Sequence, residues 1–418
     1  MLLTPPKTPL SPESPVGELL LAETAIRIEL PPSQRRKAID RYGSARTHIE
    51  REGSPLHDLV AWFYPQGSMA IRATIRARRR DDGYDIDIVA ELNLPADTSP
   101  ETALDLLFEA LNGPPGSRYH GQVERQTRCV TIHYADGMHL DVTPSIVIDP
   151  QDARKSVIFH AKPGAPAAEH FTKIMNSWAF CEHVLANTPA DLAFREAYGK
   201  RVRIHDRELL AEDAAYKDVP DAELGKSALV VAHQLMKRNR NSRYQSRKGL
   251  RMPPSVMMAA VMVDAVIEGA SISQALFAIT GDLLERLESA EREGRLVDIR
   301  NPKCRDDAFT DRWPEHRESQ RLYIGDLKLF RVQLKDLISG ERDLEEQRAL
   351  LTEMFGEGPA VSVIEDYASR LSEAVRTGAR HHLVTGRVAP AIIGATSAVP
   401  AAARPHTFYG GLLDDEDH

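Results

Sequence analysis

The sequence has few cysteines and no long apolar stretch, and these absences exclude several classes of protein. Its 418 residues include three cysteines, too few and too scattered for a disulfide framework or a zinc site. No apolar run approaches the length of a membrane span. The first residues, MLLTPPKTPLSPESP, lack the charged-then-apolar order of a signal peptide. We therefore expect a protein of the reducing cytoplasm that makes no membrane contact.

Positive charge is also in short supply. The 53 lysine and arginine residues are outnumbered by 61 aspartates and glutamates, which gives a net charge of -8. This balance argues against a surface coated with nucleic acid, although local basic stretches can still bind phosphates. The 42% of hydrophobic residues is ordinary for a globular protein. The length is sufficient for about two to three domains.

Three aspartates in two apolar strands are the most informative feature. Asp85 and Asp87 alternate with isoleucines in YDIDIVAEL, and Asp141 lies in MHLDVTPSIV. Because residues i and i+2 of a strand point to one side, Asp85 and Asp87 share a face while the isoleucines bury the other. Carboxylates this close repel one another unless a cation lies between them. Hard oxygen ligands suit Mg²⁺ that carries the phosphates of a nucleotide, so the pattern predicts a nucleotidyltransferase.

A Gly-Ser pair upstream supplies a second part of the predicted site. In Gln66-Gly67-Ser68 the glycine would let the backbone approach a triphosphate, while the Ser68 hydroxyl and nearby amides would donate to phosphate oxygens. We expect two Mg²⁺ ions, for which Mn²⁺ can substitute, held by Asp85 and Asp87. Asp141 would bind the ion at the nucleophile and orient the attacking hydroxyl.

The periodicity changes from strand-like to helical along the chain. Strands are expected at 85–92, 128–134 and 138–148, the last two joined by a hairpin at Ala135-Asp136-Gly137. Helix-length apolar periodicity follows at 228–240, 254–267, 272–293, 319–337, 343–355 and 360–377. We predict an α+β protein with four parts: a disordered N-terminus (1–16), a catalytic domain with N-terminal helices (17–165), a helical domain (166–377) and a flexible C-terminal tail (378–418).

The order of Gly-Ser, Asp-X-Asp and a lone aspartate resembles that of the DNA polymerase beta-like nucleotidyltransferases. The strings YDIDIVAEL and YADGMHLDVTPS are similar to those of the bacterial CD-NTases. These relatives of cyclic GMP-AMP synthase and oligoadenylate synthetase make cyclic oligonucleotide signals in anti-phage (CBASS) systems. The resemblance covers about residues 55 to 375 and the tail. It implies a polymerase beta-like palm, a mixed sheet with helices, and a C-terminal helical bundle, with the active-site cleft between the two lobes.

The resemblance extends into the helical half. Leu235-Met236-Lys237-Arg238 is similar to the family's spine-side helix, whose lysine contacts the donor triphosphate. Pro254-Ser255-Val256 is similar to the next helix start, whose serine does likewise, and 301–313 resembles the segment before the last helices. From the residues alone, Lys237 could be a solvated residue and Ser255 an N-cap. A polar face or a rim facing the triphosphate would explain the basic residues around Lys237: Arg238, Arg240, Arg243, Arg247, Lys248 and Arg251.

The tail and a second basic run bear on partners. The segment 406–411 resembles the C-terminal element of CD-NTases whose operons encode a ubiquitin-like conjugation (E1/E2-like) enzyme, which makes Gly411 the junction. Seven residues follow Gly411, so conjugation would require trimming, and a docking strand is the alternative. Related CD-NTases use HORMA-type activators instead, and the sequence does not choose. We interpret IRATIRARRR (71–80) as a loop at the active-site mouth, with direct nucleic-acid binding as the less favoured alternative.

The leading hypothesis is an enzyme that converts ATP and other NTPs to a cyclic di- or trinucleotide, releases pyrophosphate and activates an effector in anti-phage defence. A linear oligonucleotide synthase or RNA-tailing enzyme would share all the metal residues. A protein-modifying nucleotidyltransferase is usually small, which leaves the helical half unexplained, and a non-catalytic binding module would not need all three carboxylates. The choice of base and of linkage stays open.

Overall fold

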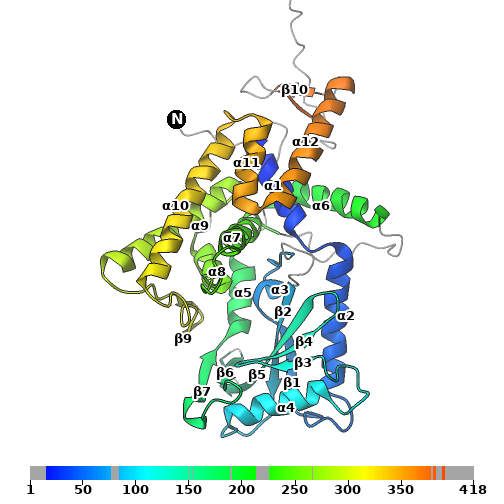
Figure 1. Cartoon of the computed structure of the whole chain (residues 1–418), viewed down its shortest axis with the longest axis vertical. Helices are drawn as coiled ribbons and strands as arrows, with labels where there is room; N and C mark the ends of the chain where they lie inside the picture. The colour runs from blue at the N-terminus through cyan, green and yellow to red at the C-terminus, as the bar shows by residue number, and fades with distance from the viewer. Residues whose placement is uncertain are drawn as a thin grey trace, which may run out of the picture.

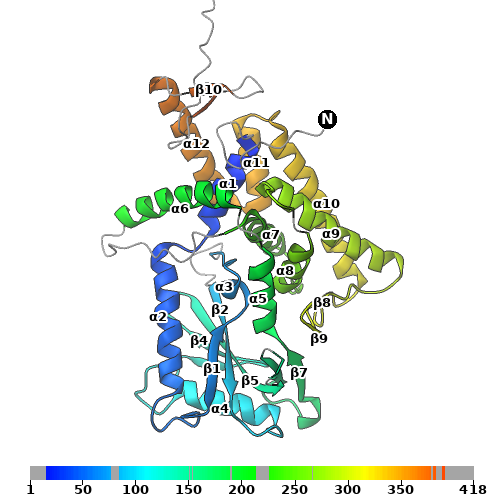
Figure 2. The ribbon, with the colours of Figure 1, turned by 180° about the vertical axis from the view of Figure 1, so that it is seen from behind.

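The computed structural model describes residues 16–76, 84–149, 151–152, 154–188, 191–212, 226–265, 267–377, 380–382 and 388–390. Figures 1 and 2 show a half built on a sheet and a half built of helices, which confirms the predicted α+β class. The predicted disordered N-terminus (except residue 16), the end of the basic run at 71–80 and most of the predicted tail, including Gly411, lie outside the described residues. The short strands β10 (Arg380–His382) and β11 (Val388–Pro390) pair with each other.

The sheet has seven strands, and its centre is a parallel pair. Five strands are ordered β1-β2-β5-β4-β3, while β6 pairs with β5 and β7 with β6. Their bounds are β1 (Val60–Pro65), β2 (Tyr84–Leu92), β3 (Val123–Arg125), β4 (Val130–His133), β5 (Met138–Asp149), β6 (Lys155–His160) and β7 (Phe171–Met175). Of these pairs, β2 and β5 run parallel and the rest antiparallel. One face packs on α2 (Pro32–Ile49) and α4 (Pro100–Asn112), which leaves the other face for the site.

The helical half surrounds α7 (Ala228–Tyr244), which is buried along nearly its whole length. It contacts α1, α8, α9 and α11. The other elements of this half and its connections are α1 (Val16–Ile28), α3 (Gly67–Ala70), η1 (Ala167–Glu169), α5 (Ser177–Asn187), α6 (Leu192–Glu212), α8 (Ser255–Asp264), α9 (Ile272–Arg292), β8 (Arg300–Asn301), β9 (Cys304–Ala308), α10 (Arg317–Ser339), α11 (Leu344–Phe355) and α12 (Glu357–Thr377). None of the helices in the described ranges is long and apolar enough to cross a membrane.

Two elements lie on the far side of the predicted domain boundaries. Helix α1 is buried on all sides and belongs to the hydrophobic core of the C-terminal helices. Strand β7 pairs with β6, so the sheet continues to Met175, beyond residue 165. Because α1 is apolar around most of its circumference, it is stable only inside a bundle. The four-part division stays a prediction, with these two placements to be taken into account.

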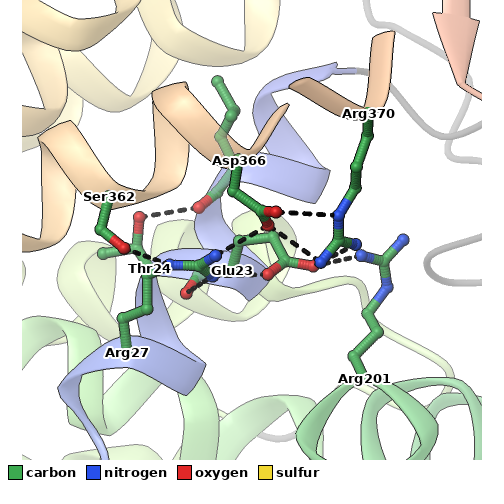
Figure 3. A network of polar contacts seen from close by, with 8 residues as sticks. Glu23, Thr24, Arg27, Arg201, Ser362, Asp366 and Arg370 are labelled. Atoms are coloured by element: carbon green, nitrogen blue, oxygen red, sulfur yellow. Dashed lines mark hydrogen bonds and ion pairs between the residues drawn. The ribbon is translucent and has the colours of Figure 1, made fainter. Parts of the chain in front are cut away.

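A polar network, buried on α1 and partly exposed on α12, joins three helices that are far apart in sequence (Figure 3). On α1, Arg27 donates to Glu23 Oε2 at 2.6 Å and to Asp366 Oδ2 on α12 at 2.8 Å. Arg201 of α6 forms a second ion pair with Glu23. Arg370 of α12 pairs with Asp366 at 2.9 Å and lies 3.8 Å from Glu23. Each carboxylate of the network therefore faces at least two guanidinium groups.

Candidate active site

The parallel pairing of β2 and β5 brings the three predicted carboxylates together. Their register sets Asp87 opposite Asp141 and Asp85 opposite His139. Ile86 and Ile88 are buried in the core under α2 and α4, so Asp85 and Asp87 lie on the other face. Asp85 is exposed, whereas Asp87 and Asp141 are half-buried. Two strands thus present like charges to one small region of the face opposite the core.

Burial and mutual repulsion dominate the electrostatics of this region. Burial, followed by the charges of Asp141 and Asp85, raises the pKa of Asp87 to about 7. Burial also raises the pKa of Asp141, an effect that a hydrogen bond from the Thr131 hydroxyl to Asp141 Oδ1 (2.5 Å) opposes. A divalent cation would relieve this repulsion, and carboxylate oxygens are the ligands that Mg²⁺ prefers. The donor set therefore fits the predicted ions.

The side chains do not enclose an ion as they stand. Among the residues with a described position, no three histidine, cysteine, aspartate or glutamate side chains are grouped closely enough to hold one. The roles of Asp85, Asp87 and Asp141 as metal ligands stay predictions.

The Gly-Ser turn lies directly against Asp87. The Gln66 N–H donates to the Asp87 carbonyl at 2.8 Å, and α3 begins at the next residue, Gly67, with φ +60°. A Cβ on Gly67 would lie 2.7 Å from Asp87 Oδ2, so both the positive φ and the close approach require glycine. Ser68 is half-buried beside it, and its carbonyl accepts from the Ala73 N–H at 2.7 Å. The contacts of Gln66, Gly67 and Ser68 with a nucleotide stay predictions.

Lys237 lies inside the protein next to this turn. Its side chain donates from Nζ to the Ala73 carbonyl at 3.0 Å, and the residue is 6% exposed. Burial, with a contribution from the charge of Arg240, lowers the pKa of Lys237 to about 7, while Asp87 and Asp85 act in the opposite direction. The alternative of a solvated surface lysine is therefore wrong. A contact between Lys237 and a donor triphosphate stays a prediction.

Ser255 is the first residue of α8, and the N-cap is Pro254, whose side chain forms no capping bond. The N-cap interpretation of Ser255 is therefore wrong, and the half-buried side chain is not committed to capping. Helix α8 contacts α3, the helix that contains Gly67 and Ser68. The predicted contact of Ser255 with a triphosphate stays a prediction.

Three of the arginines that follow Lys237 form hydrogen bonds or ion pairs within the helical half. Arg238 donates to the Phe355 carbonyl at 2.8 Å, and Arg240 donates to the Pro253 carbonyl at 2.6 Å. Arg247 binds Asp326 through both terminal nitrogens. Arg238 and Arg240 hold α7 to its neighbours, and Arg247 holds the segment after α7 to α10. Neither a solvated polar face nor a triphosphate rim describes these three side chains.

Sequence reasoning missed Thr131 and the histidine pair. Thr131 stands opposite Asp141 in the β4–β5 hairpin. The predicted turn at 135–137 could have identified this pair, because a tight turn fixes which residues of the two strands face each other. In the histidine pair, His139 Nδ1 lies 2.9 Å from His133 Nδ1, and His133 Nε2 lies 2.9 Å from Glu124 Oε2.

Comparison with known proteins gives a consistent result. The family model described as the Second Messenger Oligonucleotide or Dinucleotide Synthetase (SMODS) domain matches residues 21–154. The cyclic dinucleotide synthase CdnG of Bradyrhizobium diazoefficiens is 39% identical over 410 residues, which cover 96% of this chain and 96% of that protein. The structure of the Bradyrhizobium diazoefficiens CD-NTase CdnG in complex with GTP superposes with a TM-score of 0.71 at 37% identity, covering 84% of this chain and 98% of that one.

More distant relatives agree. The c-di-GMP synthase of Roseivirga ehrenbergii is 24% identical over 357 residues, 83% of this chain and 85% of that protein. The structure of the E. coli MS115-1 CdnC:HORMA-deltaN complex has a TM-score of 0.54 at 16% identity, covering 81% of this chain and 96% of that one. At that level of identity the likeness is one of fold.

Proposed function

The chain belongs to the CD-NTase family, and we propose that it joins two molecules of GTP into a cyclic dinucleotide at the Asp85–Asp87–Asp141 site. Membership confirms the predicted family, the polymerase beta-like fold, the nucleotidyltransferase class and the synthesis of cyclic oligonucleotides from NTPs. The finer choices, a dinucleotide and guanine, are supported by relatives named as a cyclic dinucleotide synthase and a c-di-GMP synthase and by the GTP complex of the former.

The observation that carries the proposal is the register that sets Asp87 opposite Asp141, with Gly67 packed on Asp87. Nucleotidyl transfer needs a nucleophile and a triphosphate held in line around a concentrated negative charge that metal ions can bridge. Here the Gly67-Ser68 turn and Lys237 lie on the β1 side of the β2–β5 pair. Asp141 lies on the β4 side. The donor phosphates are therefore assigned to the first side and the attacking hydroxyl to the second.

The reaction consists of two equivalent transfers. In the first, the 3′-oxygen of one GTP forms a bond to the α-phosphorus of another, the bond from that phosphorus to the bridging oxygen breaks, and pyrophosphate leaves with that electron pair. The hydroxyl proton is released as the new P–O bond forms. In the second, the free 3′-hydroxyl of the linear dinucleotide attacks its own α-phosphorus, which closes the ring and releases a second pyrophosphate.

This chain's residues supply position and charge. Asp85 and Asp87 would hold two Mg²⁺ ions and Asp141 would share the one at the nucleophile; when bound, the ions lower the pKa of the attacking hydroxyl and neutralise the leaving oxygens. Asp141 orients the attacking hydroxyl. The Ser68 and Ser255 hydroxyls and Lys237 bind phosphate oxygens of the donor; the Lys237 ammonium has three N–H donors, of which one is given to the Ala73 carbonyl. Mn²⁺ is expected to replace Mg²⁺.

Two further elements of the proposal concern partners. A downstream effector binds the cyclic product in anti-phage defence. Activation comes from a HORMA-type protein, or the tail is joined to a target at Gly411 by a ubiquitin-like conjugation enzyme. A pull-down from cells that express the neighbouring genes, followed by mass determination of the chain's C-terminus, separates the two: a free intact tail with a bound partner supports the first, and a new C-terminal linkage supports the second.

The test is incubation of the purified chain with four labelled NTPs and Mg²⁺ or Mn²⁺, beside an Asp85→Ala/Asp87→Ala variant. Products are treated with phosphatase and identified by mass. We expect a phosphatase-resistant cyclic dinucleotide of guanosine that is absent from the variant.

Other products would change the proposal in defined ways. Phosphatase-sensitive ladders would identify a linear oligonucleotide synthase or RNA-tailing enzyme. A resistant product with another base or a third nucleotide would correct the substrate or the ring size. Label transferred to protein would identify a protein-modifying enzyme.

A further inference from the structure

The segment between α9 and α10 reaches from the helical half back to the sheet, where β9 contacts β7 (Figure 2). A buried polar junction fixes it there. The fully buried Asn301 donates from Nδ2 to the Asn176 carbonyl at 2.9 Å and to Asp307 Oδ2 at 3.0 Å. The N–H of Asn176 donates to the same Asp307 oxygen at 3.3 Å. Satisfied buried hydrogen bonds hold one geometry, so this segment, residues 300–313, is a positioned arm.

The far end of this arm is fixed beside the strands that carry Thr131 and Asp141. Asp311 forms ion pairs with Arg128 at 3.0 Å and with Lys173 at 2.8 Å. Arg128 lies two residues before the start of β4, the strand paired with β5. The next residue of the arm, Arg312, is therefore held on the β4 side of the carboxylates, away from the Gly67-Ser68 turn at the end of β1.

Arg312 is exposed, and its backbone carbonyl accepts a hydrogen bond from Arg251 at 3.2 Å. Across the described part of the chain the Arg312 guanidinium forms no hydrogen bond and no ion pair within 4.0 Å. Partial burial and the charge of Arg128 lower the pKa of Arg312, whereas the charge of Asp311 acts in the opposite direction. Arg312 also lies within electrostatic reach of the Cys129 thiol, whose pKa is raised by burial and by the charges of Asp141 and Asp87. The charges of Arg312 and of the catalytic carboxylates therefore act on the same thiol.

The immediate surroundings of Arg312 carry an excess of positive charge. Arg312 lies within electrostatic reach of two other cations, Arg128 and Arg251, and of one carboxylate, Asp311, which is already paired with Arg128 and Lys173. A guanidinium that forms no ion pair of its own and lies near other cations is stabilised by a ligand that brings negative charge. On the β4 side of the carboxylates the reacting group is the nucleophile expected at Asp141, so that ligand belongs to the nucleotide that supplies it.

We propose that Arg312 binds a phosphate group of the acceptor nucleotide, the molecule whose 3′-hydroxyl attacks at Asp141. This assignment rests on the proposed nucleotidyl transfer at that site. It makes Arg312 a positioning residue for the acceptor, separate from the donor phosphates at Ser68 and Lys237.

The test separates the two nucleotides chemically. A 3′-deoxy form of the NTP that the wild type incorporates lacks the nucleophile and serves as donor alone. It is supplied in excess, with a trace of labelled acceptor that carries either a 5′-triphosphate or no phosphate. We expect Arg312→Ala to lower kcat/KM for the triphosphate acceptor about tenfold, the size of a lost charge-assisted contact. With the unphosphorylated nucleoside the variant should match the wild type, and Arg312→Lys should restore part of the loss.

The matched control is Arg300→Ala on the same arm, whose guanidinium pairs with Asp298 at 2.8 Å; both acceptors should react as in the wild type. An equal loss with both acceptors, or no loss with either, would overturn the assignment of Arg312. The wild-type reactions test the proposed function by themselves, because a different base or a linear product would be detected in them without any variant. The ratio of variant to wild type then reports on Arg312 with whichever NTP the enzyme uses.

Discussion

Two clusters of charge in this molecule follow opposite rules. In the network of α1, α6 and α12 (Figure 3), burial alone would raise the pKa of Glu23, but the charges of Arg201 and Arg27 reverse this and hold it below its ordinary value. At the β2–β5 pair the carboxylates face one another, and the pKa of Asp87 rises to about 7. The carboxylates of the first cluster are neutralised by arginines of the protein. Those of the second cluster need a bound cation to neutralise them.

The electrostatics alone therefore distinguish the two clusters: paired charges indicate a structural role, and charges that repel one another indicate a functional one. Buried charges that exist for stability are paired, since an unpaired one costs several kcal/mol. Buried like charges persist when binding or catalysis requires them. Substitution should therefore affect stability in the first cluster and activity in the second.

The largest effect is expected from Asp87→Asn. Loss of a metal-binding charge should reduce nucleotidyl transfer at least about a hundredfold. Removing one of three repelling carboxylates should leave the free energy of unfolding unchanged or raise it by about 1 kcal/mol. Initial rates and urea unfolding of the same preparation measure both. A variant that folds as stably as the wild type and keeps its activity would show that Asp87 is not a metal ligand.

The second largest effect is expected from Glu23→Gln, which should lower stability and leave activity unchanged. The variant leaves Arg27 and Arg201 without their shared carboxylate, and removing one partner of a buried ion pair should lower the free energy of unfolding by about 3 kcal/mol. The kcat of the folded enzyme should stay near that of the wild type, measured well below its melting temperature. Glu293→Gln, at an exposed carboxylate paired with Arg295, is the control and should change stability little. Equal stability of the two variants would contradict a structural role for the network.

The same network predicts the sign of a pH dependence. Because the pKa of Glu23 is lower in the folded than in the unfolded protein, its contribution is present above the ordinary value of 4.5 and disappears as pH falls through the folded pKa. The stability gap between wild type and Glu23→Gln should therefore narrow below about pH 4.5.

Glu18, also on α1, provides the opposite sign. Burial raises its pKa despite hydrogen bonds from Ser273 and Ile272. Its contribution is therefore present at low pH and is lost as pH rises through the folded pKa. The wild type should lose stability relative to Glu18→Gln as pH increases, and parallel pH profiles for the two variants would contradict both assignments. Urea unfolding at each pH measures them.

Much of the active site could be predicted because local alternation determines it. Asp85, Asp87 and their isoleucines reveal a half-buried strand, and an Asp-Gly turn reveals the hairpin that carries Asp141. The placement of Lys237 could not be read in this way. Its neighbours in sequence are basic, and burial against Ala73 depends on α7 passing through the centre of a bundle. Apart from Arg27, which lies four residues on in α1, the partners of Glu23 come from α6 and α12. No periodicity within α1 predicts pairings at such separation.

The contact of Thr131 with Asp141 could be predicted in part, because the hairpin turn determines which residue faces Asp141. Substitution of Thr131 is expected to have the smallest effect. Its hydroxyl donates to Asp141 Oδ1 at 2.5 Å from the facing strand, so it fixes the orientation of the carboxylate that is expected to align the nucleophile. Thr131→Val keeps the shape and removes the hydrogen bond, which should lower kcat about tenfold, equivalent to about 1.4 kcal/mol. Thr131→Ser retains the hydroxyl and should stay within about threefold of wild type. Equal losses in both variants would assign the effect to packing of the β4–β5 hairpin. A loss confined to the valine variant, with unchanged urea unfolding, would show that orientation of Asp141 is what the hydroxyl provides.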